Sequence, residues 1–179
     1  MKYGHISQKP YCCVPACVQM ILRRRKLQLL PQTEIAYDLG IILPPKERHL
    51  FKSYKGSKPK SGWGTRIDIK KYSLTSFFQK RGYNLKEKFI AGKVFSSEKS
   101  FKDFLSKNVK NDLLVCFNHP LLYKGRGSKG HASLIQRFTG EYIILSDPDS
   151  GHKKPRKVPV ANLLKAIKGH YKGGVWVVK

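Results

Sequence analysis

The stretch from Gln8 to Leu22 constrains the fold of this chain more than any other, because it predicts a loop that runs directly into a buried helix. One helical face, at spacings of three and four residues, is formed by Cys13, Ala16, Cys17, Met20 and Ile21. Further apolar residues between them predict that the helix is buried on more than one side. Pro15 suits the first helical turn, and the four cations at positions 23–26 suit the C-terminal end.

The position of Cys13 in this helix has a chemical consequence. A cysteine in the first turn lies at the positive end of the helix dipole, which lowers the thiol pKa and favours the nucleophilic thiolate. Cys12 is the adjacent alternative. Gln8, five residues before Cys13, could supply an amide N–H to an oxyanion hole. Cys12 and Cys13 could equally be inert cysteines of the core, because free cysteine is among the most buried residue types.

The bulk composition predicts one globular domain over residues 1–179, with a helical part over about 1–110 and a sheet part over about 111–179. Hydrophobic residues make up 40% of the chain, which is typical of a soluble protein. No apolar run reaches the length of a membrane span, and the N-terminus lacks the apolar core of a secretory signal. We therefore expect a cytoplasmic monomer, although secretion without a cleaved signal would leave no trace in the sequence.

The cysteines predict reduced thiols. Cys12, Cys13 and Cys17 are crowded together, and Cys116 is distant from them. This spacing is a poor disulfide framework and lacks the C-x-x-C pairs of zinc sites. A reducing, cytosolic setting fits better, and we expect no metal or other cofactor.

The charge is strongly positive, with 36 Lys and Arg against 11 Asp and Glu, a formal net charge of +25. Such a field attracts nucleic acid, anionic membrane or acidic protein, and composition does not choose among them. No aromatic and basic pattern of the RNA-recognition or single-strand kind is present. A solvated basic surface without a partner explains the same composition.

The order of expected elements is typical of an α+β fold, with helices first and an antiparallel sheet after them. We expect helices near 13–26, 32–39, 68–80 (capped by Asp68), 97–109 (capped by Ser97) and 160–168. We expect strands near 83–90, 113–117, 130–138, 142–147 and 173–178. The irregular segment between them, about 41–66, predicts a lid or cleft wall, and the presence of Trp63 in it suggests that part of the segment docks onto the body.

A cysteine nucleophile needs a base and a group that orients the base. His131 opens an apolar strand, so we expect it at the edge of a cleft, whereas the other histidines lie in less suitable segments: His5, His49, His119, His152 and His170. Asp147 ends the partner strand of the same hairpin. His131 and Asp147 share a face of the sheet only if the hairpin has a three-residue turn or a bulge, which the triad therefore predicts. A histidine at a strand start is more often structural, and Asp147 could simply belong to a turn.

These residues together resemble the papain-like cysteine peptidases, and most closely the bacteriocin-processing (double-glycine) peptidase family and its stand-alone relatives. The resemblance is carried by Gln8, by 13–16 leading into 20–22, by Gly130-His131, by Asp147-Pro148, and by Gly64-Thr65 and Gly173-Gly174. The family usually has Gly directly after the nucleophile, where this sequence has Val14.

The resemblance implies a papain-like α+β fold and a cysteine peptidase. It implies Cys13 as nucleophile, His131 as base, Asp147 as the orienting acid and Gln8 as the oxyanion donor. Because the sequence contains no transporter segment, we do not carry over the family's leader-peptide substrate. We expect a protein or peptide substrate, and the positive charge of the chain leaves an acidic substrate open. Two alternatives stay open: other acyl chemistry at the same site (deamidation, acyl transfer or delipidation), and a basic protein that binds nucleic acid or membrane and has structural cysteines.

Overall fold

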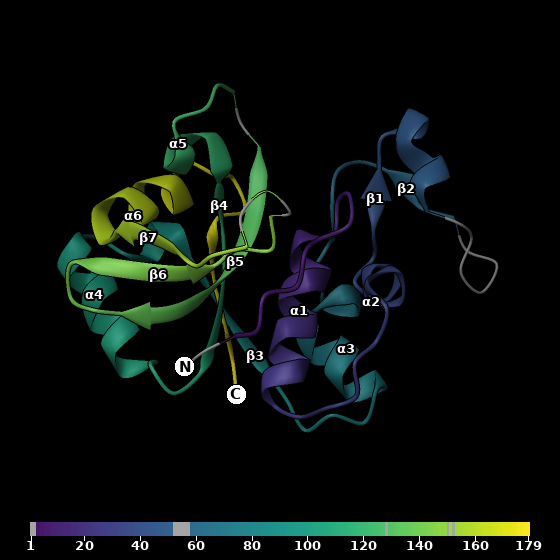
Figure 1. Cartoon of the computed structure of the whole chain (residues 1–179), viewed down its shortest axis with the longest axis horizontal. Coiled ribbons are helices and arrows are strands. Elements are labelled where there is room, and N and C mark those ends of the chain that lie inside the picture. The colour runs from purple at the N-terminus through teal and green to yellow at the C-terminus, as the bar shows by residue number, and fades with distance from the viewer. Residues whose placement is uncertain (1–2, 52–57, 128, 150, 152) are drawn as a thin grey trace.

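The computed structural model describes residues 3–51, 58–127, 129–149, 151 and 153–179 (Figure 1). The α-helices are α1 (Cys13–Arg24), α2 (Gln32–Asp38), α3 (Leu74–Lys80), α4 (Glu98–Lys107), α5 (His119–Tyr123) and α6 (Val160–Lys168). The strands are β1 (Ile42–Leu43), β2 (Lys60–Ser61), β3 (Glu87–Ala91), β4 (Asp112–Asn118), β5 (Gly130–Phe138), β6 (Tyr142–Ser146), β7 (Arg156–Pro159) and β8 (Gly174–Val178). Among the described residues, no helix has the length and apolar character to cross a lipid bilayer.

The first helix forms where the sequence predicts it and is buried on several sides. Its N-cap is Cys12 and its first residue is Cys13. Val14, Ala16, Cys17, Val18, Met20, Ile21 and Leu22 are all buried. Arg24 and Arg25 at its C-terminal end reach the buried carboxylate of Asp112, the first residue of β4.

The main sheet has the strand order β3-β8-β4-β5-β6-β7, and all of its described neighbours pair antiparallel. Because side chains alternate across a strand, β4 contributes to two cores. Leu114 and Cys116 pack with α1, α2 and α3, whereas Leu113, Val115 and Phe117 pack with α4 and α6. Helices therefore cover both faces of the sheet, and every residue of β4 is buried.

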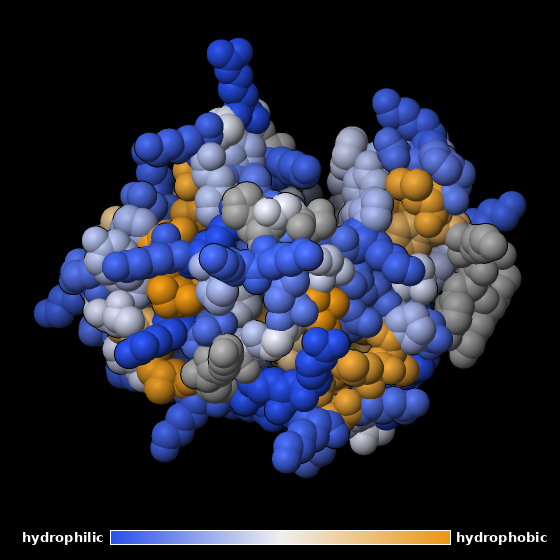
Figure 2. Space-filling model, viewed as in Figure 1, coloured by the Kyte–Doolittle hydropathy of each residue, from blue (hydrophilic) through white to orange (hydrophobic). Residues whose placement is uncertain are grey.

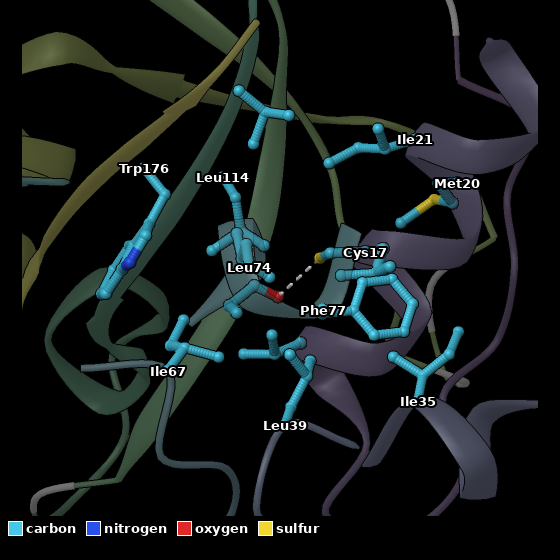
Figure 3. Close-up of a cluster of buried hydrophobic side chains, with 14 of the residues drawn as sticks. Cys17, Met20, Ile21, Ile35, Leu39, Ile67, Leu74, Phe77, Leu114 and Trp176 are labelled. Carbon is cyan, nitrogen blue, oxygen red and sulfur yellow. Dashed lines mark hydrogen bonds between the residues drawn. The ribbon is translucent and has the colours of Figure 1, made fainter. Parts of the chain in front are cut away.

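The core beneath α1 ties the helical part to the sheet (Figure 3). Met20 and Cys17 of α1 face Leu74 and Phe77 of α3, and Leu114 and Trp176 of the sheet lie across from them. The α+β class with a cysteine-bearing helix packed on an antiparallel sheet is thus confirmed. The strand expected at 83–90 is β3, which adds to the edge of this sheet beside β8.

Some local expectations are wrong. Asp68 does not cap a helix but forms an ion pair with Lys172 (Nζ–Oδ2 2.9 Å), and Ser73 caps α3 by accepting a hydrogen bond from Ser76 N–H. The region after β4, for which no element was expected, contains a short helix, α5, which the side chain of Asn118 caps. β7 was not anticipated, since it has four residues, of which two are cations and only one is buried.

The segment from 41 to 66 stands beside the N-terminal end of α1 (Figure 1). Within it β1 and β2 pair parallel, and residues 52–57 lie outside the described residues. Part of the segment docks on the body, as expected, because Leu43 and Phe51 are buried in one cluster with Cys12 and Ala36. The side chain of Trp63 itself is 72% exposed and contacts the ring of Tyr11 in the loop before α1, at 5.6 Å between centroids. Figure 2 shows a notch at the top of the view between this segment and the α5–β5 side of the molecule.

Candidate active site

The two cysteines at the start of α1 have different environments. Cys12 is completely buried, and burial raises the pKa of its thiol to about 12. Cys13 is only partly buried. Burial alone would raise the pKa of the Cys13 thiol, but the hydrogen bond and charge of His131 and the backbone N–H groups of Ala132 and Val14 lower it below its usual value. Cys13 is therefore the cysteine whose surroundings favour a thiolate.

The start of α1 is held against the beginning of β5. The thiol of Cys17, one turn after Cys13, donates to the carbonyl oxygen of Ala132 (3.6 Å). Ala132 follows His131 directly in β5, so this contact fixes the helix beside the histidine. His131 in turn lowers the pKa of the Cys13 thiol through hydrogen bonding and charge.

His131 also pairs with Asp147, although the two residues lie in different strands of the hairpin. Nε2 of His131 is 2.7 Å from Oδ1 of Asp147. Because Nε2 faces the carboxylate, Nδ1 is the ring nitrogen available to the Cys13 thiol. Both residues are buried, with 7% and 1% of their surface exposed.

The register of the hairpin explains this pairing. Phe138 pairs with Ile143 and Arg137 with Ile144, but Leu134 pairs with Ser146, so the register shifts by one residue at a bulge between Ile135 and Arg137. The shift places His131 and Asp147 on the same face as diagonal neighbours. Of the two ways in which the sequence could bring them together, a three-residue turn or a bulge, the protein uses the bulge.

The carboxylate of Asp147 is surrounded by donors besides His131. Oδ1 also accepts from the backbone N–H of Asp149 (3.0 Å), and Oδ2 accepts from the hydroxyl of Tyr123 in α5 (2.9 Å). Nε of Arg156 lies 3.5 Å from Oδ2, and the guanidinium covers the Tyr123 ring at 4.1 Å from its centroid. Burial works against ionisation, but these donors, His131 first, hold the pKa of Asp147 well below its usual range.

The pKa shifts favour an ion pair. Burial lowers the pKa of His131, but its hydrogen bonds to Asp147 and Cys13 outweigh burial and raise it to about 9. A thiol with a lowered pKa beside an imidazole with a raised pKa favours thiolate and imidazolium over the neutral pair at neutral pH. Such a pair is a nucleophile with its proton donor already in contact.

The backbone of Gln8 is held beside the residues that follow Asp147. Its backbone N–H donates to the carbonyl oxygen of Pro148, the residue after Asp147 (2.8 Å). Its side-chain oxygen Oε1 is buried and has no hydrogen-bond partner among the described residues. The loop that carries Gln8 is clamped by Gln32 of α2, whose amide accepts from Lys9 N–H (2.8 Å) and donates to the carbonyl of Ser7 (2.8 Å).

The other described histidines do not pair with Asp147 as His131 does. The ring of His119 packs edge-on against His131, at 5.1 Å between centroids, and burial followed by the charge of His131 lowers its pKa. His49 is exposed and its Nδ1 contacts the carbonyl of Lys46, and His152 lies outside the described residues. The sequence reasoning missed Tyr123, Arg156 and Gln32, for which no local pattern gives a signal.

The comparisons with known proteins concern the family and the fold of the chain. A family model described as the Peptidase_C39 like family matches residues 1–175. No curated protein matches the sequence. Among solved structures, a crystal structure from Bacillus anthracis described as a "putative C39-like peptidase" aligns with a TM-score of 0.62 and 13% identity, over 99% of this chain and 95% of that chain. At this identity the alignment shows a shared fold.

Proposed function

Since this chain belongs to the Peptidase_C39 like family, as its resemblance to papain-like peptidases predicted, we propose that it hydrolyses peptide bonds as a cysteine peptidase. The observation that carries the proposal is the placement of His131 between the thiol of Cys13 and the buried carboxylate of Asp147. A nucleophile, a base and a group that orients the base are the parts that thiol-based acyl chemistry needs.

The proposed reaction has two steps. In the first, the thiolate of Cys13 attacks the carbonyl carbon, the C–S bond forms, and the C–N bond breaks as the imidazolium of His131 gives its proton to the leaving amine. In the second, neutral His131 takes a proton from water, the resulting hydroxide attacks the thioester, and the acid leaves as the thiolate is restored. Asp147 stays ionised and keeps the imidazole oriented throughout.

The negative charge that develops on the carbonyl oxygen needs donors. The backbone N–H of Cys13 at the start of α1 is one candidate, and the side-chain amide of Gln8 is the other. The buried side-chain oxygen Oε1 of Gln8 has no hydrogen-bond partner among the described residues. Because an amide can be turned by 180° with little change in shape, the turned amide would direct its N–H into that position.

Cys13 is preferred over Cys12 because His131 lowers the pKa of the Cys13 thiol, whereas burial raises the pKa of the Cys12 thiol. The complete burial of Cys12 leaves no room for substrate. The thiols of all four cysteines are free, which fits a cytoplasmic location, and we propose that location too.

The proposal is tested by the rate of alkylation with iodoacetamide as a function of pH, for wild type, Cys13→Ala, Cys12→Ala and His131→Ala. We expect one thiol that reacts fast at pH 6, is lost in Cys13→Ala, is retained in Cys12→Ala and is slowed in His131→Ala. If every thiol reacts slowly with an ordinary pKa near 8.5, the catalytic proposal is wrong. Mass spectrometry of products from a peptide library then separates hydrolysis from deamidation or acyl transfer.

A further inference from the structure

We propose that the substrate of this site is an acidic peptide, held by a basic rim that we define as Lys9, Lys124, Arg126, Lys129, Lys153 and Lys154. This inference rests on the proposed function and adds the class of substrate. It depends on the positions of these cations along the chain and on the ion pairs that the neighbouring acids form.

Each cation of the basic rim is attached to a residue of the site through a short piece of chain. Lys124 and Arg126 follow Tyr123, and Lys129 precedes Gly130-His131. The two ends of this loop are joined, because the backbone N–H of His119 donates to the carbonyl of Lys129 (2.8 Å). Lys9 follows Gln8, and Lys153 and Lys154 lie between Asp149 and Arg156. All six cations are exposed.

Within the part of the chain that the structure describes, no acid forms an ion pair with the basic rim. The two acids in the segments that carry it are Asp147 and Asp149, and Arg156 contacts both (3.5 Å and 2.9 Å). None of the six cations forms an ion pair with a described acid. The positive field at the site is therefore not cancelled locally, and low-dielectric walls strengthen such a field.

Elsewhere on the surface some cations have acidic partners. Lys102 of α4 is paired with both Glu98 and Glu141, and Lys80 and Arg81 share Asp38. On the helix α4, which packs on the side of the sheet away from α1, three lysines are balanced in part by Glu98 and Asp103. The cations of these two clusters are thus neutralised in part by acids, whereas no described acid pairs with a cation of the basic rim.

An acidic peptide fits this site better than nucleic acid does. The basic rim adjoins, along the chain, residues that hold a thiolate and imidazolium pair, and the chemistry of such a pair acts on an acyl carbon. A peptide with Asp or Glu near the scissile bond offers both an acyl group and carboxylates, whereas a nucleic acid offers only the negative charge. Side chains of Lys and Arg would bind these carboxylates through charge-assisted hydrogen bonds.

The first test compares alkylation of Cys13 by anionic iodoacetate with alkylation by neutral iodoacetamide. The rim variant is Lys124→Gln/Arg126→Gln/Lys129→Gln, and the matched control is Lys99→Gln/Lys107→Gln/Lys110→Gln, three exposed lysines in and after α4. We expect the ratio of the two rates to fall about threefold to tenfold at low salt in the rim variant and to stay unchanged in the control. In wild type the ratio should fall as salt is raised.

This ratio separates the two proposals. If no thiol reacts fast with either reagent, the proposed function fails. If Cys13 reacts fast but the rim variant keeps the wild-type ratio, the acidic-substrate proposal alone is wrong.

The second test uses one peptide scaffold with Glu, Gln or Lys at the positions flanking the scissile bond. We expect the Glu peptide to have the highest kcat/KM, and the rim variant to lose that preference mainly through KM. If the rim variant instead loses affinity for a single-stranded oligonucleotide while the peptide preference is unchanged, the acidic-peptide proposal is overturned in favour of nucleic acid.

Discussion

Nε2 of His131 lies 2.7 Å from Oδ1 of Asp147 because one extra residue in β5 corrects the register of the β5–β6 hairpin. The pairing of Phe138 with Ile143, continued without a bulge, would place His131 and Asp147 on opposite faces of the sheet. The bulge between Ile135 and Arg137 restores a shared face. The geometry of the proposed site therefore depends on backbone irregularity outside it.

The Cys13–His131 pair predicts an unusual pH dependence. The pKa of Cys13 is lowered and that of His131 is raised to about 9. Alkylation of Cys13 should therefore be fast through the neutral range and slow only as pH falls through the lowered thiol pKa. Turnover of a peptide should also fall as pH rises through about 9, where His131 loses the proton that it gives to the leaving amine. Stopped-flow alkylation measures the titration of the thiol at low pH, and the pH profile of kcat measures the loss of turnover at high pH. A single rise of the alkylation rate with a midpoint near pH 8.5 would contradict the ion pair.

Replacement of Asp147 by Asn should weaken the nucleophile. The hydrogen bond to Asp147 is the strongest influence that raises the pKa of His131, so its loss lowers that pKa and disfavours the imidazolium that stabilises the thiolate. We expect alkylation at pH 7 to slow by about tenfold or more, with a change of about 1.4 kcal/mol for each pKa unit. Asp149→Asn is the control, because its backbone N–H still donates to Asp147. Equal effects of the two substitutions would mean that general charge, rather than the pairing, sets the reactivity.

Tyr123→Phe should destabilise the fold in a pH-dependent way. The hydroxyl donates to the ionised carboxylate of Asp147, and a hydrogen bond of this kind contributes about 1–2 kcal/mol at a partly buried site. Since the pKa of Asp147 is depressed in the folded protein, the stability that its ionisation contributes is present above the unfolded value, about 3.8, and is lost as pH falls through the folded value. The deficit should therefore be seen in urea unfolding at pH 7 and shrink in strong acid. Tyr142→Phe, at an exposed tyrosine, should show neither effect.

The elements predicted well are those with a strong local signal. The helix from Cys13 has an apolar pattern with a proline in its first turn, and α4 has the capping serine Ser97, which makes a reciprocal capping box with Ser100. The strands β4 and β5 are apolar runs bounded by polar residues. In each case the residues that define the element are neighbours in the sequence.

The parts that were missed depend on contacts between distant segments. Arg156 reaches Asp147 and Asp149 only because β7 pairs with β6, with Arg156 opposite Leu145, and β7 itself is too short and polar to show a strand pattern. Part of the segment 41–66 docks as expected, but through Leu43 and Phe51, whereas Trp63, the residue that suggested docking, is exposed. Local sequence cannot determine which distant side chains come together.

Asp112→Ala should be strongly destabilising without a direct effect on the site. The carboxylate of Asp112 is fully buried and accepts from Tyr3 (2.6 Å), Arg24 (2.6 Å) and Arg25 (2.7 Å), so it joins the N-terminal segment and the end of α1 to the sheet. Loss of one partner of a buried ion pair leaves uncompensated charge, and we expect a cost of about 3–5 kcal/mol. Urea unfolding measures this cost. Asp103→Ala, at an exposed aspartate of α4, should cost less than about 0.5 kcal/mol.

Gln8→Ala should separate transition-state stabilisation from activation of the nucleophile. If the amide of Gln8 holds the oxyanion, its removal affects only the step in which negative charge develops, and kcat should fall about 100- to 1000-fold with KM nearly unchanged. Alkylation of Cys13 by iodoacetamide forms no oxyanion, so its rate should stay within about twofold of wild type. Gln32→Ala, which loosens the clamp on the loop from Ser7 to Lys9, should impair turnover less and raise KM as well. A Gln8→Ala variant that loses alkylation and turnover together would show that Gln8 supports the fold of the site instead of the transition state.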